Sequence, residues 1–227
     1  MKAICIFSGG LDSISTAAYL KEQGYQLYLL TFNYGQRATK EVRVAEEFGN
    51  KLGAEHKIID ISFMKELYGK SNVLTYHANI PSKFDYSIVV PVRNAVFLTI
   101  ASAWAFSINA NLLAYGAHKD DKNYPDCRRE FAKALEEALN LAEEDGIKQK
   151  IREKIEIWSP AIEGFDKKDL ISIGYKILGS DIFKSWSCYS DNDKHCGICE
   201  SCINRKRAFK NAKIKDETDY LNMDNEH

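Results

Sequence analysis

The feature that most constrains the fold is the regular alternation of short apolar runs with longer segments of helical period. The runs have strand length and are apolar at nearly every residue, as expected for strands buried on both faces. Five strands are predicted, at Lys2–Phe7, Gln26–Asn33, His56–Ile61, Asn111–Tyr115 and Lys154–Trp158. Because helices between such strands make parallel crossovers, the sequence predicts an α/β fold with a doubly wound parallel sheet.

Helical segments lie between and after these strands. They are predicted at Asp12–Gln23, Ala38–Leu52, Arg93–Ser107, Arg128–Glu144, Lys167–Leu178 and Ser201–Lys213. Residues 62–90 are long for a loop in a compact domain, so we expect either a functional lid or a short helix near Phe63–Tyr68. We divide the chain into an α/β domain (1–160) and a helical, four-cysteine region (161–227) packed on it. The polar tail, residues 216–227, is expected to fray.

Residues 95–117 are long and apolar enough to resemble a membrane span. Asn109 and Asn111 interrupt the stretch, so we predict a buried helix that runs into a buried strand. The chain carries 31 Lys+Arg and 32 Asp+Glu, a balance that gives no reason to expect non-specific binding to nucleic acid or to a membrane surface. The apolar run Ala3–Phe7 is too short for a signal peptide. We therefore expect a cytoplasmic protein with no membrane or direct nucleic-acid partner.

A glycine-rich loop, Ser8-Gly9-Gly10-Leu11-Asp12-Ser13, joins the first strand to the first helix. Glycines let backbone N–H groups turn into one concavity, and the helix N-terminus adds unpaired donors. The loop can therefore bind phosphate, and we refer to residues 8–13 as the phosphate loop. It matches neither the Walker A pattern nor the dinucleotide fingerprint. Asp12 would repel an anion unless a cation intervened, so we expect Mg²⁺ to bridge Asp12 and the phosphates. The alternative is a plain Gly-Gly turn in which Asp12 caps the helix.

Polar segments follow three of the predicted strands. The phosphate loop follows the first strand, residues 33–37 follow the second, and residues 116–128 follow the fourth. Since ligands of open parallel sheets bind beyond the carboxyl ends of the strands, these segments are expected to form one site.

Four of the six cysteines crowd near the C-terminus with the spacing C-x₇-C-x₂-C-x₂-C. They are Cys188, Cys196, Cys199 and Cys202. This tight spacing indicates a metal site in a reducing compartment, because a disulfide framework would spread its cysteines. Four thiolates suit a structural Zn²⁺ without an open coordination position, and an iron–sulfur cluster is the alternative. His195 could replace one ligand, but more often such a histidine contacts solvent or hydrogen-bonds beside the metal.

The other two cysteines lie apart from the cluster. Cys5 falls in the first strand, where it is expected to be a small buried hydrophobe. Arg128 and Arg129 adjoin Cys127 and are expected to lower its pKa. A covalent role for Cys127 stays open.

The motif Ser-Gly-Gly-Leu-Asp-Ser resembles the signature of the ATP pyrophosphatases, which have the adenine nucleotide alpha-hydrolase fold. This resemblance implies cleavage of ATP between the α- and β-phosphates. Further segments are FNYGQR (32–37), VPVRN (90–94), GAHKDDKNYPDCR (116–128) and the cysteine cluster. In this order they resemble the 7-cyano-7-deazaguanine synthase family, which makes the nitrile precursor of queuosine, and the resemblance covers nearly the whole chain.

The resemblance implies an ATP-dependent ligase that converts 7-carboxy-7-deazaguanine and ammonia to 7-cyano-7-deazaguanine. A nitrile forms from a carboxylate only when both oxygens leave, so an adenylated acid and an adenylated amide are expected in turn, each releasing AMP. No glutaminase domain fits in this length, which implies free ammonia or a separate donor. The resemblance also favours a homodimer.

Candidate roles can be given to individual residues. ATP phosphates and Mg²⁺ are assigned to Ser8, Gly9, Gly10, Leu11, Asp12 and Ser13. Arg93 or Lys119 could neutralise developing phosphate charge, although Arg93 could equally make a helix-start salt bridge. Carboxylates that could accept hydrogen bonds from the guanine-like N–H edge are Asp120, Asp121 and Asp126, of which one is expected only to be solvated. Tyr34 or Tyr124 could stack on a base or simply pack.

Two other interpretations stay open. One is a tRNA-modifying sulfur transferase of the same fold, whose RNA face would be a basic C-terminal helix carrying Arg205, Lys206, Arg207, Lys210 and Lys213. The other is a zinc-ribbon interaction module on a degenerate nucleotide fold. The intact phosphate loop argues against the second, and a solvated helix is the simpler explanation of the basic residues.

Overall fold

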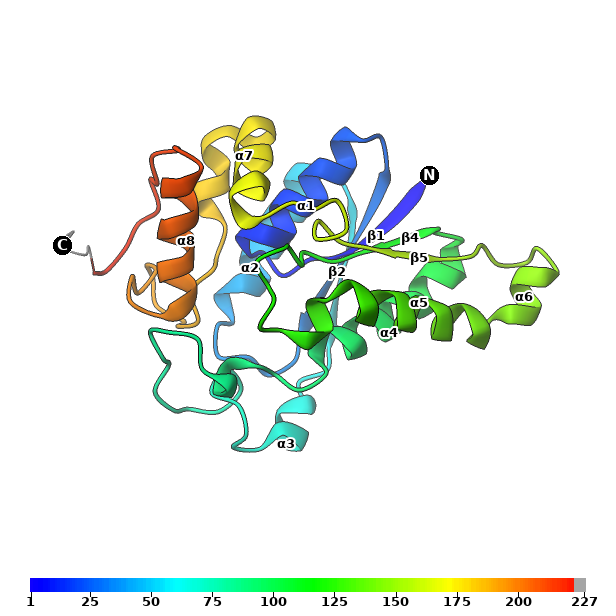
Figure 1. The fold of residues 1–227 in the computed structure, drawn as a ribbon, viewed down its shortest axis with the longest axis horizontal. Helices are drawn as coiled ribbons and strands as arrows, with labels where there is room; N and C mark the ends of the chain where they lie inside the picture. The colour runs from blue at the N-terminus through cyan, green and yellow to red at the C-terminus, as the bar shows by residue number, and fades with distance from the viewer. Residues whose placement is uncertain (223–227) are drawn as a thin grey trace.

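The computed structural model describes residues 1–222 and contains one five-stranded parallel sheet (Figure 1). Its strands are β1 (Lys2–Ile6), β2 (Gln26–Asn33), β3 (Glu55–Asp60), β4 (Leu112–Ala114) and β5 (Glu156–Trp158). They lie in the order β3-β2-β1-β4-β5. The chain thus builds outward from β1 in both directions, and the switch point lies between β1 and β4. The predicted doubly wound parallel sheet is confirmed.

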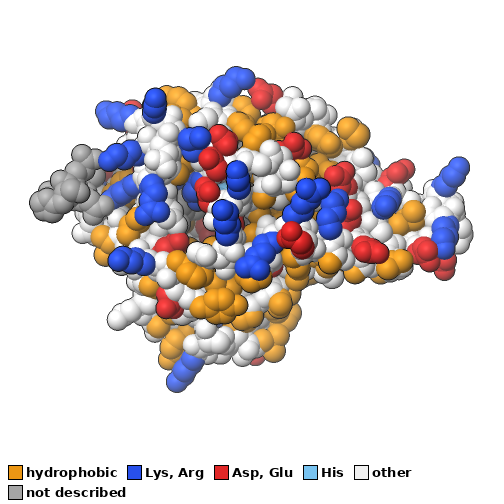
Figure 2. Space-filling view, in the orientation of Figure 1, with side chains coloured by type: hydrophobic (Ala, Val, Ile, Leu, Met, Phe, Trp, Pro, Cys, Tyr) orange, Lys and Arg blue, Asp and Glu red, His pale blue; other side chains and the backbone are white. Residues whose placement is uncertain are grey.

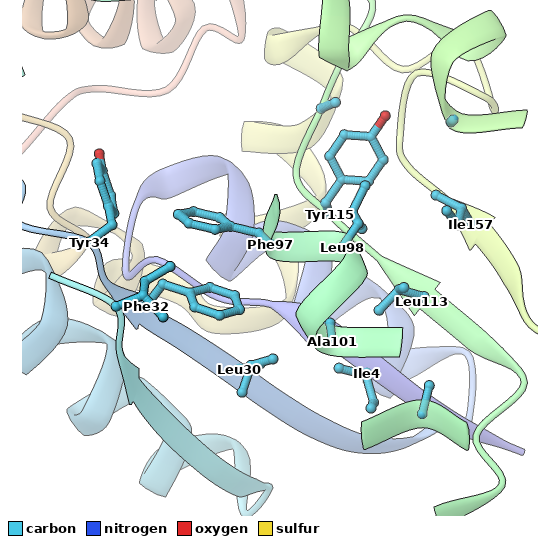
Figure 3. Packing of buried hydrophobic residues seen from close by; sticks show 14 of the residues in the cluster. Ile4, Leu30, Phe32, Tyr34, Phe97, Leu98, Ala101, Leu113, Tyr115 and Ile157 are labelled. Carbon is cyan, nitrogen blue, oxygen red and sulfur yellow. The ribbon is translucent and has the colours of Figure 1, made fainter. Parts of the chain in front are cut away.

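Helices cover both faces of the sheet. One face packs against α4 (Arg93–Ile108) and α5 (Arg129–Ala142), with buried residues of β1, β2, β4 and β5 beneath them. Figure 3 shows Ile4, Leu30, Leu113 and Ile157 of the strands gathered near Leu98 and Ala101 of α4. The opposite face packs against α1 (Leu11–Glu22) and α2 (Lys40–Leu52). Burial on both faces explains why β1, β2 and β4 are apolar at nearly every position, whereas the edge strand β3 is largely exposed and carries Glu55 and Lys57.

The stretch that resembles a membrane span is a core element of this fold. By length and composition alone, Tyr86–Ile108 would pass as one membrane-crossing helix. In the structure α4 ends at Ile108 and is capped by Asn109, whose φ is 51°, and the chain enters β4 in the interior of the sheet. The predicted helix leading into a buried strand is confirmed: one face of α4, which includes Leu98 and Ala101, is buried, and β4 is buried throughout.

The C-terminal region lies against the first helix. It contains α7 (Lys167–Leu178), the 3₁₀ turn η3 (Gly179–Lys184) and α8 (Glu200–Asn211). Leu11 of α1 packs in one buried cluster with Ile171 of α7 and Phe209 of α8. This contact brings the end of the chain next to the loop that follows β1.

The segment between β3 and α4 contains α3 (Met64–Tyr68) and η1 (Tyr86–Ile88), so the predicted short helix is confirmed. It lies below α8 in Figure 1, and the N–H of Glu200 donates to the Pro81 carbonyl at 3.1 Å. The remaining elements are η2 (Pro125–Cys127) and α6 (Glu144–Lys148).

The expectation that the tail frays is wrong for residues 216–222, while residues 223–227 lie outside the described part of the chain. Tyr220 is buried, and the N–H of Leu221 donates to the His195 carbonyl at 2.8 Å. The hydrophobic face of Tyr220 packs with the cysteine cluster, which holds the tail in place.

Candidate functional site

A cavity of about 1240 Å³ opens at the carboxyl edge of the sheet. Its walls come from the loop after β1, the end of β2, the segment after β4, the first turn of α7 and one face of α8. The face drawn in Figure 2 carries acidic and basic side chains close together around a hollow left of its centre. Single-ligand pockets are usually about 300–1,000 Å³, so this one has room for a nucleotide and a second ligand.

The phosphate loop turns tightly at Gly9, which has a φ of +79°. A Cβ there would overlap the backbone of Glu41 and Ala45 in α2, so the close approach of loop and helix requires glycine. The hydroxyl of Ser13 donates to the Gly10 carbonyl at 3.0 Å and accepts from the Ser8 N–H at 3.2 Å. Gly10 is the N-cap of α1 and has no side-chain cap, which leaves the helix N-terminus open to an anion.

Asp12 does not cap α1; its carboxylate joins a charged cluster. Lys167 Nζ, from the first turn of α7, lies 2.9 Å from Asp12 Oδ2, and His118 Nε2 lies 3.9 Å from Oδ1. Burial alone would raise the pKa of Asp12, but Lys167 and His118 lower it below its usual value. Burial and the nearby Asp12 charge raise the pKa of Asp121, the fourth member. The lysine therefore compensates an otherwise repulsive pair of carboxylates.

A second polar group lies at the end of β2. Gln36 Nε2 donates to Glu41 Oε1 at 2.9 Å, and Gln36 Oε1 accepts from the Tyr34 N–H at 2.8 Å. Burial raises the pKa of Glu41 to about 7, although Arg93 opposes the shift. Arg93 NH1 is 3.5 Å from the Tyr34 hydroxyl, and both side chains line the cavity. This end of the cavity thus offers a fixed carboxyl group and a guanidinium.

The residues after β4 separate into two groups. Asp120, Asp121 and Tyr124 line the cavity together with the phosphate loop. Lys119 is exposed and is not among the cavity residues; its N–H donates to the Phe165 carbonyl. Asp126 also lies outside the lining, where it accepts from the Asn94 N–H at 3.0 Å and holds the start of α4.

The predicted low pKa of Cys127 is wrong. Burial and the nearby carboxylates of Asp121 and Asp126 raise the pKa of this thiol, and Arg93 only partly opposes them. Arg128, expected to act as the lowering charge, instead donates to the Lys122 carbonyl at 3.1 Å. A neutral thiol at neutral pH is a poor nucleophile.

The four C-terminal cysteines form one closed cluster. Their sulfur atoms all lie within 4.8 Å of one another and all four residues are buried. Sγ of Cys196 and Cys202 are 3.9 Å apart, close to the ~3.8 Å edge of a tetrahedron with Zn–S bonds of about 2.3 Å. Backbone N–H groups donate to the sulfurs of Cys188 and Cys196 at 3.3 Å, as suits thiolates. The donor set fits a metal ion such as zinc.

His195 and Gly197 support the cluster without joining it. His195 Nε2 accepts from the Ser187 N–H at 3.1 Å, and its ring lies 4.4 Å from that of Trp186. Gly197 has a φ of +80°, and a Cβ there would overlap the Asn222 carbonyl. The turn between the ligands therefore requires glycine.

The cysteine cluster and the phosphate loop are joined by a short segment. The N–H of Trp186 donates to the Gly9 carbonyl at 2.9 Å, two residues before the cluster begins at Cys188. Arg205, fully buried, donates to Ser185 and Ser187 on either side of Trp186. The predicted basic helix thus points one of its five cations into the core, where it orders this segment.

Sequence patterns missed several residues that line the cavity. Lys167, His118, Glu41 and Glu200 were not singled out. Lys167 follows β5, so the rule that placed the segments after the other strands at this edge could have found it. The other three carry no motif that separates them from ordinary polar residues.

A family model and curated relatives indicate the same protein family over almost the full length of this chain. A family model described as Queuosine biosynthesis protein QueC matches residues 2–213. A 7-cyano-7-deazaguanine synthase of Caldicellulosiruptor saccharolyticus is 37% identical over 97% of this chain and 96% of its own. The enzyme of the same description from Methanococcus vannielii is 38% identical over 97% of this chain and 99% of its own.

Two solved structures share the fold. One is described as a predicted subunit of a tRNA methyltransferase from Methanocaldococcus jannaschii, with 25% identity, a TM-score of 0.50 and coverage of 77% and 74% of the two chains. The other is a 4-thiouridine synthetase in complex with RNA and bound ATP, with 17% identity, a TM-score of 0.54 and coverage of 93% of this chain and 50% of that one. The second likeness bears on the fold alone.

Proposed function

Because the chain belongs to the family of the queuosine biosynthesis protein QueC, we propose that it is an ATP-dependent ligase that converts 7-carboxy-7-deazaguanine and ammonia to 7-cyano-7-deazaguanine. The observation that carries the proposal is that the phosphate loop opens on the same cavity as the segments after β2, β4 and β5. A cavity of about 1240 Å³ can hold ATP and a base side by side.

The ATP phosphates would lie on Ser8, Gly9, Gly10, Leu11 and Ser13 at the uncapped N-terminus of α1. Asp12 fits the role of a magnesium ligand, since its carboxylate faces the cavity and has a lowered pKa. Mg²⁺ held there would neutralise phosphate charge. Lys167, 2.9 Å from Asp12, and Arg93, which lines the same cavity, would supply further positive charge to the phosphates.

The chain's own residues mainly bind and orient the two reactants. Holding the substrate carboxylate against the α-phosphate makes adenylation effectively unimolecular. Ammonia then displaces AMP to give the amide, whose oxygen is adenylated in a second round before AMP leaves and the nitrile forms. Each oxygen of the carboxylate leaves on an AMP, so two ATP are consumed per nitrile.

The four-cysteine cluster would hold a structural zinc ion, because four buried thiolates leave no coordination position for a substrate. Its place beside the phosphate loop, through Trp186, suggests that the metal orders the C-terminal wall of the cavity. Residues 161–227 would accordingly form a region that packs on the α/β domain (1–160) and does not fold as an independent domain. A homodimer is the proposed assembly.

Incubation of the protein with Mg·ATP, ammonium and 7-carboxy-7-deazaguanine tests the function directly. The expected products, detected by mass spectrometry, are the nitrile, AMP and pyrophosphate. Replacing the acid with the 7-amide should give the same nitrile and release half as much AMP per product. Formation of ADP, or sulfur transfer to tRNA in place of nitrile, would contradict the proposal.

A further inference from the structure

Three segments that are far apart in sequence meet on one wall of the cavity. Phe84 comes from the segment before η1, Tyr124 from the segment after β4, and Glu200 from the first turn of α8. The N–H of Glu200 donates to the Pro81 carbonyl, which ties α8 to the Phe84 segment. Glu200 lines the same cavity as Lys167 and Asp12, so this wall and the phosphate loop enclose one space.

The Glu200 carboxylate is held in one orientation by neighbouring side chains. The Tyr189 hydroxyl donates to Oε2 at 3.1 Å, and Asn204 Nδ2 donates to Oε1 at 2.5 Å. Each carboxylate oxygen can accept a second hydrogen bond, so the group retains acceptor capacity. An oriented carboxylate in a cavity suits a ligand with two adjacent N–H donors.

The three aspartates after β4 are used differently, because each accepts from a backbone N–H. Asp120 Oδ2 accepts from Lys167 at 3.2 Å, Asp121 Oδ2 from His118 at 2.9 Å, and Asp126 Oδ2 from Asn94 at 3.0 Å. These bonds shape the loop and start the helices α7 and α4. Within residues 1–222 the hydrogen bonds to the Glu200 carboxylate come from the side chains of Tyr189 and Asn204, so this carboxylate does not shape a loop or start a helix as the aspartates do.

Aromatic rings lie beside this carboxylate. The rings of Phe84 and Tyr124 meet edge to face with their centroids 5.7 Å apart. Tyr124 and Glu200 both adjoin Tyr189, whose hydroxyl donates to the carboxylate, and all three residues line the cavity. A ring face next to a fixed carboxylate is the arrangement that binds a planar heterocycle with a donor edge.

We propose that Glu200 accepts hydrogen bonds from the N–H edge of a guanine-type base, and that Tyr124 supplies the face on which this base stacks. The inference rests on the proposed function, because it takes 7-carboxy-7-deazaguanine as the ligand. It assigns the base edge to α8 in place of the aspartates after β4. The helix α8, which carries Cys202 of the cysteine cluster, then selects the substrate.

A ligand-by-residue comparison tests Glu200. Calorimetry would measure the Kd of 7-carboxy-7-deazaguanine and of its analogue without the 2-amino group, for the full-length zinc-loaded wild type and for Glu200→Gln. The wild type should prefer the natural base about tenfold or more, since the analogue leaves a carboxylate unpaired. In Glu200→Gln the preference should vanish, while the Kd of Mg·ATP stays unchanged.

Matched variants separate recognition from structure. Glu163→Gln is the control, because Glu163 is exposed, lies outside the cavity lining and accepts from the Trp158 indole. It should keep the preference, as should Asp121→Asn. Zinc content and the thermal midpoint of every variant are measured alongside, because Glu200 adjoins Cys199. Retention of the preference by Glu200→Gln, or its loss in Asp121→Asn alone, would overturn the inference.

Tyr124 gives a second, independent variant away from the metal ligands. Tyr124→Leu should weaken both bases about tenfold without changing their ratio, and Tyr124→Phe should restore binding because it keeps the ring. Equal affinity of Tyr124→Leu and wild type would overturn the stacking role. If the wild type bound Mg·ATP but neither base, the proposed function would fail, and this inference with it.

Discussion

The cysteine cluster and the cavity both concentrate ionisable side chains, but they do so in opposite ways. In the cluster, four sulfurs lie within 4.8 Å, all are buried, and backbone N–H groups point at them. In the cavity, charges of both signs face an open space of about 1240 Å³, and Asp12 Oδ1 lacks a hydrogen-bond partner among the described residues. The cluster is arranged for one small ion, whereas the cavity keeps unsatisfied groups for ligands that enter and leave.

This contrast predicts that the cluster controls stability and the cavity controls turnover. Variants in the cluster should lose metal and fold stability together. Variants in the cavity should lose binding or rate while the fold remains.

Cys202→Ser should remove the metal and destabilise the C-terminal region by several kcal/mol, because the metal-binding free energy contributes to folding. Metal analysis and thermal unfolding would show the loss. Cys5→Ser is a matched control, since Cys5 lies in β1 outside the cluster, although it will cost some stability through its burial. If the Cys202→Ser protein kept both its zinc content and its thermal midpoint, the claim that the cysteine cluster controls stability would be contradicted.

Asp12→Ala should lower ATP turnover about 100-fold or more, because the proposed magnesium ligand and the partner of Lys167 are lost together. The thermal midpoint should change little, since Asp12 lines the cavity. AMP release measured at saturating Mg·ATP is the readout. Intact turnover would remove the magnesium assignment.

Lys167→Met should slow AMP formation about tenfold, and Lys167→Arg should recover part of the rate because it keeps the charge. Lys176→Met provides a control on the same helix, since Lys176 is exposed and lies outside the cavity lining. Equal rates for the Met variants at 167 and 176 would show that the Asp12–Lys167 pair has no part in turnover.

Glu41→Gln should alter the pH dependence of stability. The native pKa of Glu41 is raised to about 7 from 4.5, so the folded protein binds its proton more tightly than the unfolded chain. Its contribution is fully present below about pH 4.5 and is lost as the pH rises through about 7. The variant should therefore gain about 1–3 kcal/mol over wild type between pH 4.5 and 8. Denaturant unfolding across this range would measure it, and a constant difference would contradict the raised pKa.

Cys127→Ser should have the smallest effect, within about threefold in rate, since burial raises the pKa of the thiol and adenylation needs no sulfur nucleophile. The rate of nitrile formation is the measurement. A loss of a hundredfold or more would indicate a covalent role.

The sequence predicts a structural feature correctly where that feature depends on residues close together in the chain. Strand runs, the loop from Ser8 to Ser13 and the spacing from Cys188 to Cys202 each reflect chemistry within a few residues. The parallel-sheet rule then brought Asp121 and Tyr124 to the phosphate loop, as the cavity shows.

The sequence does not predict the position of a side chain where that position depends on packing between elements far apart in the chain. Lys167 reaches Asp12 only because α7 packs on α1, and Glu200 enters the cavity only because α8 lies against the segment at Pro81. The charge of Arg128 was assigned to Cys127 from adjacency, but the side chain turns to a carbonyl. Neighbours in sequence are poor guides to electrostatics when the direction of a side chain is unknown.

The central claim, that the cavity activates a carboxylate by adenylation, is tested most directly by following oxygen. The wild-type protein would be incubated with ATP, ammonium and 7-carboxy-7-deazaguanine carrying ¹⁸O in both carboxylate positions. The account predicts two AMP per nitrile, each with one ¹⁸O, and unlabelled pyrophosphate. Label in inorganic phosphate, with ADP as the nucleotide product, would contradict it.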